Sequence, residues 1–297
     1  MGALDHVALF ESKRRFLLGL AYRLLGSYAD AEDAVQDTFL KWREVDRRTI
    51  VNPSAWLTTT CTRHCIDLLR SAQRNRVAYV GTWLPEPVTL ATDEASERAM
   101  ELAASLSTAF LLLLERLTPK ERAAYLLHEI FELGYPEVAA ALGMQEAACR
   151  KLVSRARSSI GQATVRQLPP RERQDALLAA FQEAVSTGAT ARLTALLADD
   201  IVLSADGGGK VPTIAHTLRG VAEVLGFITD ALHAYWAPYN WQPVDINGSR
   251  GALLLEQGCV TTAVSFSYDG QGRISGIYII RNPDKLRHLS NIQVIHR

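Results

Sequence analysis

The change of pattern at Leu168-Pro169-Pro170 is the feature that most restricts how this chain folds. Before these residues, apolar side chains recur every three to four positions, which is the period of an amphipathic helix. After two further helical segments, short stretches alternate between apolar and polar residues, which is the period of a strand. One regular architecture does not accommodate both patterns. We therefore expect a multidomain chain that is all-α first and α+β afterwards.

Length and composition agree with several folded domains. The 297 residues are about twice a domain of ~150 residues, and 48% hydrophobic against 22% charged residues is typical of folded protein. We find no apolar run of the ~18 residues that span a bilayer and no signal-peptide core near the N-terminus. The four cysteines form no dense framework. We expect a cytoplasmic monomer without membrane contact, disulfides, metal or cofactor.

The charge is zero overall but unevenly distributed. Residues 1–77 carry 12 basic and 9 acidic side chains, and residues 145–170 carry 5 basic and 1 acidic. Between them, residues 78–144 carry 4 basic and 10 acidic side chains. Two separate basic segments indicate two contacts with nucleic acid.

The first basic segment lies on the third of three predicted helices. The first helix ends before Gly26, and the second starts at Ser27 and has a strongly acidic polar face. The third starts with Asn52 as N-cap and Pro53 at the first helical position. A stripe of arginines on this helix, beside Trp56, is the kind of surface that binds single strands or melted duplex. Alone, Trp56 fits a core position better than a binding site. Cys61, His64 and Cys65 are also interpreted as core residues, because no fourth zinc ligand is evident.

The second basic segment has the pattern of a helix-turn-helix. Thr118-Pro119-Lys120-Glu121 predicts a capping box, and Tyr135-Pro136 opens a helix that ends at Leu142. A turn at Gly143 leads to a basic helix over residues 146–161. The N-terminal side chains of that helix, Cys149 among them, are then placed to reach base edges. The alternative is an ordinary helical hairpin with a solvated basic face.

The last part of the chain predicts an α+β domain. We expect helices over residues 172–186 and 189–198 and strands near 200–205, 239–246, 250–257, 259–267 and 273–281. Asn247-Gly248 and Asp269-Gly270 are typical hairpin turns, so we expect a curved antiparallel sheet.

The sequence resembles a known family over almost its whole length. FLLGLAYRLLGSYADAEDAVQDTFLKWRE (16–44) and NPSAWLTTTCTRHCIDLLRSAQRNR (52–76) resemble region 2 of extracytoplasmic-function (ECF) sigma factors, and residues 106–161 resemble region 4. WLPEP (83–87), DGGGK (206–210) and NPDKL (282–286) resemble signatures of the sigma-J-like subgroup, which carries a C-terminal SnoaL-like extension.

This resemblance implies a domain organisation. It places sigma region 2 at residues 1–77, a linker at 78–105, the region 4 helix-turn-helix at 106–168 and a SnoaL-like (NTF2-like) cone at 171–297. The implied partners are core RNA polymerase and promoter DNA.

The resemblance also implies roles for individual residues. In region 2.2, the polymerase-binding residues would be Asp30, Glu32, Asp33, Gln36, Asp37 and Lys41. The family parts the strands of the promoter −10 element and captures a flipped base. The DNA-binding residues for this element would be Arg47, Asn52, Trp56, Arg63, Asp67, Arg70 and Arg74. The DNA-binding residues for the −35 element would be Gln145, Glu146, Arg150, Lys151, Ser154, Arg155 and Arg157.

The C-terminal extension leaves a regulator and an enzyme to be weighed. Its titratable groups include Asp206, His216 and Asp230, but no pair has a spacing that specifies a reaction. The resemblance instead suggests docking on the linker, through an interdomain set of residues: Trp83, Leu84, Pro85, Glu86, Pro87, Asp206, Gly207, Gly208, Gly209, Lys210, Asn282, Pro283, Asp284, Lys285 and Leu286.

The favoured function is therefore a non-enzymatic sigma factor regulated in cis. The alternatives are a one-component regulator whose C-terminal cone senses a small-molecule ligand, and a DNA-binding protein fused to a working cyclase or isomerase.

Overall fold

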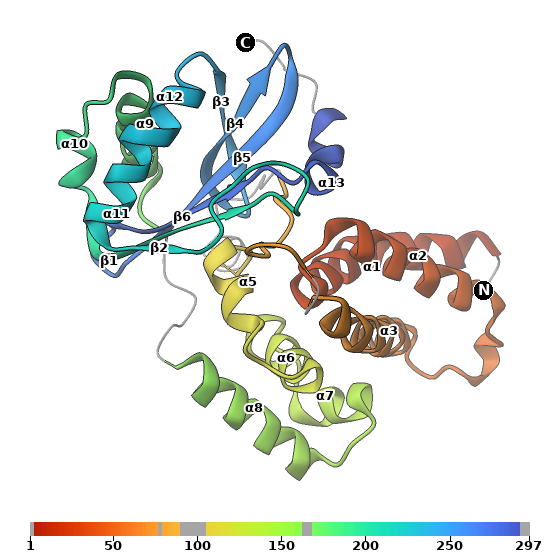
Figure 1. The fold of residues 1–297 in the computed structure, drawn as a ribbon. Helices are drawn as coiled ribbons and strands as arrows, with labels where there is room; N and C mark the ends of the chain where they lie inside the picture. The colour runs from red at the N-terminus through yellow and green to blue at the C-terminus, as the bar shows by residue number, and fades with distance from the viewer. Residues whose placement is uncertain (1–2, 77–78, 90–104, 162–167, 292–297) are drawn as a thin grey trace. The chain divides into compact units, whose positions relative to one another are not determined.

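The computed structural model describes residues 3–76, 79–89, 105–161 and 168–291 (Figure 1). The chain divides into two compact units. Unit 1 contains residues 1–78 and 113–162, and unit 2 contains residues 79–112 and 163–297. The chain therefore passes from unit 1 to unit 2, back to unit 1 and again to unit 2. The linker signature belongs to the same unit as the C-terminal domain.

The first part of unit 1 is a bundle of three helices. These are α1 (Ala3–Leu25), α2 (Tyr28–Glu44) and α3 (Pro53–Arg76), with a short 3₁₀ turn, η1 (Arg47–Thr49), before α3. Gly26 has φ +69° and ends α1, and the Ser27 hydroxyl accepts a hydrogen bond from the Asp30 amide at 3.2 Å. The predicted helix starts at Ser27 and at Asn52 are confirmed, since the Asn52 side chain accepts from the Ala55 amide at 3.1 Å.

The second part of unit 1 contains the predicted helix-turn-helix. After α6 (Pro119–Tyr125) and a π-helical turn, η2 (Leu126–Ile130), α7 (Tyr135–Leu142) and α8 (Glu146–Ile160) follow. The predicted capping box of Thr118 and Glu121 is present. Gly143 has φ +63°, a left-handed conformation that costs glycine little, and it makes the sharp turn between α7 and α8.

Unit 2 is built on a six-stranded sheet in the order β2-β1-β6-β5-β4-β3. The strands are β1 (Leu197–Asp206), β2 (Leu218–Arg219), β3 (Asn240–Ile246), β4 (Ser249–Glu256), β5 (Cys259–Tyr268) and β6 (Ile274–Ile280). Our expectation of an antiparallel sheet is wrong for β1 and β6, which pair in parallel. The long connection between them contains helices, and a parallel pair needs such a crossover instead of a hairpin.

One face of the sheet is covered by helices, as Figure 1 shows. They are α9 (Arg171–Thr187), α10 (Ala191–Thr194), α11 (Gly220–Phe227), the π-helical turn η3 (Ile228–Leu232) and α12 (His233–Trp236). The helix predicted over 189–198 is too long, because β1 already starts at Leu197. The spacing of Leu193, Leu197 and Ile201, all buried, suits both a helix and a strand. We did not predict the helical segment 220–236.

The opposite face of the sheet is covered by the linker, by residues 108–114 and by residues 283–291, which are distant from one another in sequence. Buried side chains of the linker (Leu84), of α13 (Pro283–Leu286) and of the following 3₁₀ turn η4 (Arg287–Asn291) pack there on Tyr278 and Ile280 of β6. Ala109 and Leu112 of α5 (Thr108–Leu114) also pack against this cluster. Successive side chains of β6 point to opposite faces of the sheet, so Ile277 and Ile279 pack in the core beneath the helices, whereas Tyr278 and Ile280 pack in the cluster on the other face.

Candidate functional site

Helix α2 exposes an acidic face. Its buried stripe contains Ala31, Ala34, Val35, Thr38 and Trp42, so the polar side chains between them point to solvent. These exposed residues are the six predicted to bind polymerase: Asp30, Glu32, Asp33, Gln36, Asp37 and Lys41.

A hollow of about 620 Å³ lies between the end of α2, the loop before α3 and the first half of α3. Of the predicted −10 residues, Asn52, Trp56, Arg63 and Asp67 line it. Trp56 stands against buried Trp42 with ring centroids 5.4 Å apart, so its indole forms a fixed aromatic wall.

The other predicted −10 residues lie apart from the hollow or cannot be placed. Arg70 is exposed and pairs with Asp67 at 3.0 Å. The side chains of Arg47 and Arg74 lie outside the described residues.

Two arginines join the three-helix bundle to the second half of unit 1. Arg63 of α3 donates from Nε to the Ala141 carbonyl at 2.9 Å and from a terminal nitrogen to the Ala140 carbonyl at 3.1 Å. Arg122 of α6 is 1% exposed and donates to the Leu24 carbonyl at 2.7 Å. Each guanidinium therefore caps the C-terminal end of a helix in the other half, where the helix dipole favours a cation. We did not predict this reciprocal contact.

The exposed side of α8 carries the predicted −35 residues. Gln145, Arg150, Lys151, Ser154, Arg155 and Arg157 are exposed, and Glu146 is half-buried. Cys149 is wholly buried, so the expectation that it reaches base edges is wrong. It lies one turn before Leu152 and Val153 on the core side of α8.

All three arginines of α8 are paired with carboxylates. Arg150 bonds to Glu146 at 2.5 Å and lies over the Tyr135 ring, 4.2 Å from its centroid. The guanidinium of Arg155 lies 3.3 Å from Glu121, and that of Arg157 lies 2.6 Å from Glu129. Binding a DNA phosphate therefore exchanges an existing ion pair for a new one.

A buried ion pair stands at the centre of the interdomain residues. The Asp206 side chain, at the end of β1, is 0% exposed, and its Oδ2 lies 2.7 Å from Nζ of Lys285 in α13. The same Oδ2 accepts a hydrogen bond from the Leu84 amide at 2.8 Å, and Lys285 Nζ donates to the Leu84 carbonyl. The peptide groups of one linker residue are thus bound by both members of the ion pair.

Aromatic side chains complete this site. Lys285 Nζ lies 4.4 Å from the Trp83 ring centroid and 5.2 Å from that of Tyr79. The Tyr79 hydroxyl donates to Asp206 Oδ1 at 2.6 Å and accepts from Asn282 Nδ2 at 2.9 Å. Burial and the neighbouring Asp206 carboxylate raise the pKa of Tyr79.

The glycines of residues 206–210 permit close packing. A Cβ on Gly208 would lie only 2.3 Å from the side-chain nitrogen Nδ2 of Asn282, so no other residue fits there without a shift. Gly208 also has φ +62°. The Gly208 amide donates to Asp206 Oδ1 at 2.9 Å. At the exposed end of the loop, Lys210 pairs with Asp284, and this lysine lowers the pKa of the Asp284 carboxyl.

The structure thus brings together most of the predicted interdomain residues. Pro85, Glu86 and Pro87 of the linker are buried, and the Pro87 carbonyl lies 2.7 Å from Nε2 of His288. Tyr79 and His288 were missed because they lie just outside the signatures. Gly207 is buried, Gly209 and Pro283 are exposed, and Leu286 is in the core beside Leu84.

Comparisons with known proteins follow this division. Residues 9–75 match the Sigma-70 region 2 family, and residues 107–160 match the Sigma-70 region 4 family. The ECF RNA polymerase sigma factor SigJ of Mycobacterium tuberculosis is 36% identical over 292 residues, covering 94% of this chain and 92% of SigJ. The chain belongs to the ECF sigma factors.

Other relatives extend this similarity. The probable ECF sigma factor SigI of M. tuberculosis is 32% identical over 61% of this chain and 63% of its own length. The crystal structure of M. tuberculosis SigJ superposes with a TM-score of 0.73 at 33% identity, covering 95% of this chain and 98% of that one. The match includes the sheet domain, and the predicted fold class of two helical sigma domains and an NTF2-like domain is confirmed.

Membership establishes the general function. The chain is a sigma factor that binds RNA polymerase and promoter DNA and acts in transcription initiation. The sigma factors it resembles are regulators of transcription, and neither matching family is one of enzymes. Within the described residues, no helix is both long and apolar enough to cross a bilayer.

Proposed function

We propose that the C-terminal domain of this sigma factor regulates transcription initiation in cis by holding the linker. The observation that carries the proposal is the Asp206–Lys285 ion pair, whose two members bind the amide and the carbonyl of Leu84. The linker joins the two sigma regions along the chain. A linker fixed in this way restricts the separations that the two regions adopt on a promoter.

We also propose how region 2 acts on the −10 element. Opening duplex costs a few kcal/mol of stacking for each base extruded, and that cost must be offset by contacts to the extruded base. The hollow beside Trp56 provides an aromatic wall for stacking, and Lys41 and Arg63, which also line it, provide positive charge. Arg70 extends the basic track on α3.

For the −35 element, we propose readout by α8 in the major groove. Gln145 and Glu146 at its N-terminal end are placed to contact base edges, while Lys151, Arg155 and Arg157 are placed to contact phosphates. The acidic face of α2, for its part, is proposed to dock on polymerase.

The free chain is expected to bind DNA weakly, because its net charge is zero and three arginines of α8 are already paired. Polymerase then supplies much of the affinity for DNA, and the sigma factor determines where on the promoter the complex binds. Tight, salt-insensitive binding of duplex by the free chain would contradict this. A gel shift with and without core polymerase tests it.

Run-off transcription tests the regulatory proposal. Core polymerase, genomic DNA of the encoding organism and the full-length chain are combined, and transcripts are sequenced. A chain truncated after Pro170 and the D284A/K285A variant should change the output of individual promoters. A control variant, Thr194→Ala, lies in α10 and should leave it unchanged. Identical transcript profiles for all four proteins would reject cis regulation.

The remaining predictions concern partners and location. We propose that the protein works as a monomer in the cytoplasm, where polymerase and promoters are found. A small-molecule ligand of the C-terminal domain stays a prediction.

A further inference from the structure

The turn between β3 and β4 binds two other segments of unit 2 through one residue, Asn247. Its backbone amide donates to the Val88 carbonyl at 2.8 Å, and its Oδ1 accepts from the Val88 amide at 2.7 Å. Its Nδ2 donates to Thr108 Oγ1 at 3.2 Å. Asn247 is 1% exposed. One buried side chain therefore connects the end of the described linker segment to the first residue of α5.

Further contacts fasten the start of α5 to the same sheet. Thr108 Oγ1 lies 3.1 Å from the Ser265 hydroxyl of β5, and both residues are buried. Leu112, one turn further along α5, packs on the outer apolar cluster of the sheet. Residues 107–160 are those that match sigma region 4. The beginning of region 4 is therefore held within unit 2.

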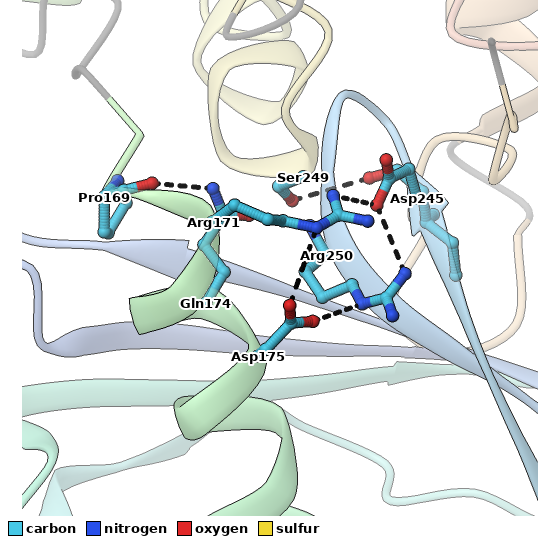
Figure 2. A network of polar contacts seen from close by, with 8 residues as sticks. Pro169, Arg171, Gln174, Asp175, Asp245, Ser249 and Arg250 are labelled. Atoms are coloured by element: carbon cyan, nitrogen blue, oxygen red, sulfur yellow. Dashed lines mark hydrogen bonds and ion pairs between the residues drawn. The ribbon is translucent and has the colours of Figure 1, made fainter. Parts of the chain in front are cut away.

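The segment that follows region 4 is held by the same hairpin (Figure 2). Gln174 of α9 donates to the Pro169 carbonyl at 2.7 Å and accepts from the Arg250 amide of β4 at 2.8 Å. Arg171 bonds to Asp245 of β3 at 2.5 Å. Arg250 bonds in turn to Asp175 of α9 at 2.6 Å, which closes the network. Asp245 and Arg250 flank the turn that contains Asn247.

The helix-turn-helix thus lies on a stretch of chain whose two ends meet one hairpin. Seven peptide units separate Gly161, just after α8, from Leu168, and they reach at most about 25 Å when extended. A tether at both ends limits the positions of α8 more than a tether at one end does.

We propose that Asn247 is a positioning residue that holds the start of α5, and with it the first residues of region 4, against the linker. It thereby narrows the range of spacings between the −35 and −10 elements that the factor accepts. The proposal rests on the linker-based regulation above and adds a residue and a measurable consequence to it. Asn247 has φ +51° in a turn that glycine also adopts. Asn247→Gly therefore removes both side-chain bonds and keeps the turn.

A distance measurement tests the tether without any promoter. Cys259 is exposed and Cys61, Cys65 and Cys149 are buried, so spin labels are attached at Cys259 and at an introduced S159C on α8 in the full chain. N247G should widen the distribution of distances between the labels. Thr108→Val, which removes the bonds of the Thr108 hydroxyl to Asn247 and Ser265 but keeps those between Asn247 and Val88, should widen it less, and T194A should leave it unchanged. Unchanged widths in both N247G and T108V would overturn the proposal, and T108V decides alone if N247G fails to fold.

A transcription assay tests the consequence. A promoter found with the wild-type chain is rebuilt with one or two base pairs added to or removed from the spacer between its elements. N247G should initiate normally at the original spacing and about threefold better than wild type at the altered ones. Equal spacing profiles would overturn the proposal. Absence of any wild-type transcript would instead contradict the proposed function, and the distance measurement would then decide on the tether.

Discussion

Arg63 Nε donates to the Ala141 carbonyl at 2.9 Å, although 78 residues separate the two in sequence. The arginine lines the hollow of region 2, whereas the carbonyl lies in the last turn of the first helix of the helix-turn-helix. Two of the five N–H donors of the arginine are engaged in this way, so a DNA phosphate must either use the remaining donors or displace these two bonds. Contact between the two halves of unit 1 and binding of DNA at the hollow therefore compete for one side chain.

Arg63→Met should separate these two roles. It removes two hydrogen bonds from a charged donor, each of which contributes about 1.5 kcal/mol or less at a partly exposed site. We expect urea unfolding of the full chain to show a loss of about 1–2 kcal/mol, and Arg63→Lys to restore part of it. Arg14→Met, which breaks only an exposed pair with Glu11, serves as the control. Equal urea midpoints for R63M and wild type would show that the bonds from Arg63 to the end of α7 do not stabilise the protein.

Lys285→Met should destabilise unit 2 strongly. It leaves the Asp206 carboxylate buried without its cation, which costs roughly 3–5 kcal/mol. For a unit of this size, we expect the midpoint of thermal unfolding to fall by on the order of 10 °C. The D206N/K285M double variant carries no buried charge at this site and should recover part of the loss. A double variant that loses as much stability as the D206N and K285M single variants added together would show that the pair is not coupled.

Tyr79 gives unit 2 a predicted dependence on alkaline pH. Its pKa is raised in the folded state from an ordinary value of 10.0, because burial and the Asp206 carboxylate disfavour the phenolate. A raised pKa contributes stability that is fully present below pH 10 and is lost as the pH rises from 10 towards the folded-state value. Tyr79→Phe should flatten this part of the stability profile, measured by denaturant titration between pH 8 and about 11. A profile unchanged by the substitution would contradict the assignment.

Local signals in the sequence predicted the helices of unit 1 well. Ser27, Asn52, Thr118 and Gly143 act through bonds to residues a few positions away, so their positions alone mark the helix ends. The same locality explains the failures in unit 2. The parallel pairing of β1 and β6 depends on a crossover of many residues, and no local period encodes it.

For the candidate sites too, residues within local sequence signatures were predicted, and residues that act through distant partners were not. The signatures identified Asp206 and Lys285, whereas Tyr79, Asn247 and Arg122 act through partners 98 to 203 residues away. Nothing near Tyr79 or Arg122 in the sequence marks them out, and Asn247-Gly248 indicates a turn without indicating its contacts to distant segments. A buried arginine such as Arg122 is especially hard to predict, because arginine is normally exposed.

Glu129→Gln should strengthen the contact of α8 with duplex DNA. It releases Arg157 from an ion pair of 2.6 Å, and the freed guanidinium can neutralise one more phosphate. We expect severalfold tighter binding of a fluorescent duplex at low salt and a salt dependence steeper by about one unit in the slope of log K against log salt.

Glu172→Gln changes the net charge equally but lies on α9, away from α8 in the chain, and is the matched control. Both variants are titrated with the same duplex across a series of salt concentrations. Because a general change of charge affects both variants alike, only their difference reports on the ion pair. Identical affinity and slope for E129Q and E172Q would show that Glu129 does not restrain Arg157, and the weak binding expected of the free chain would then need another cause.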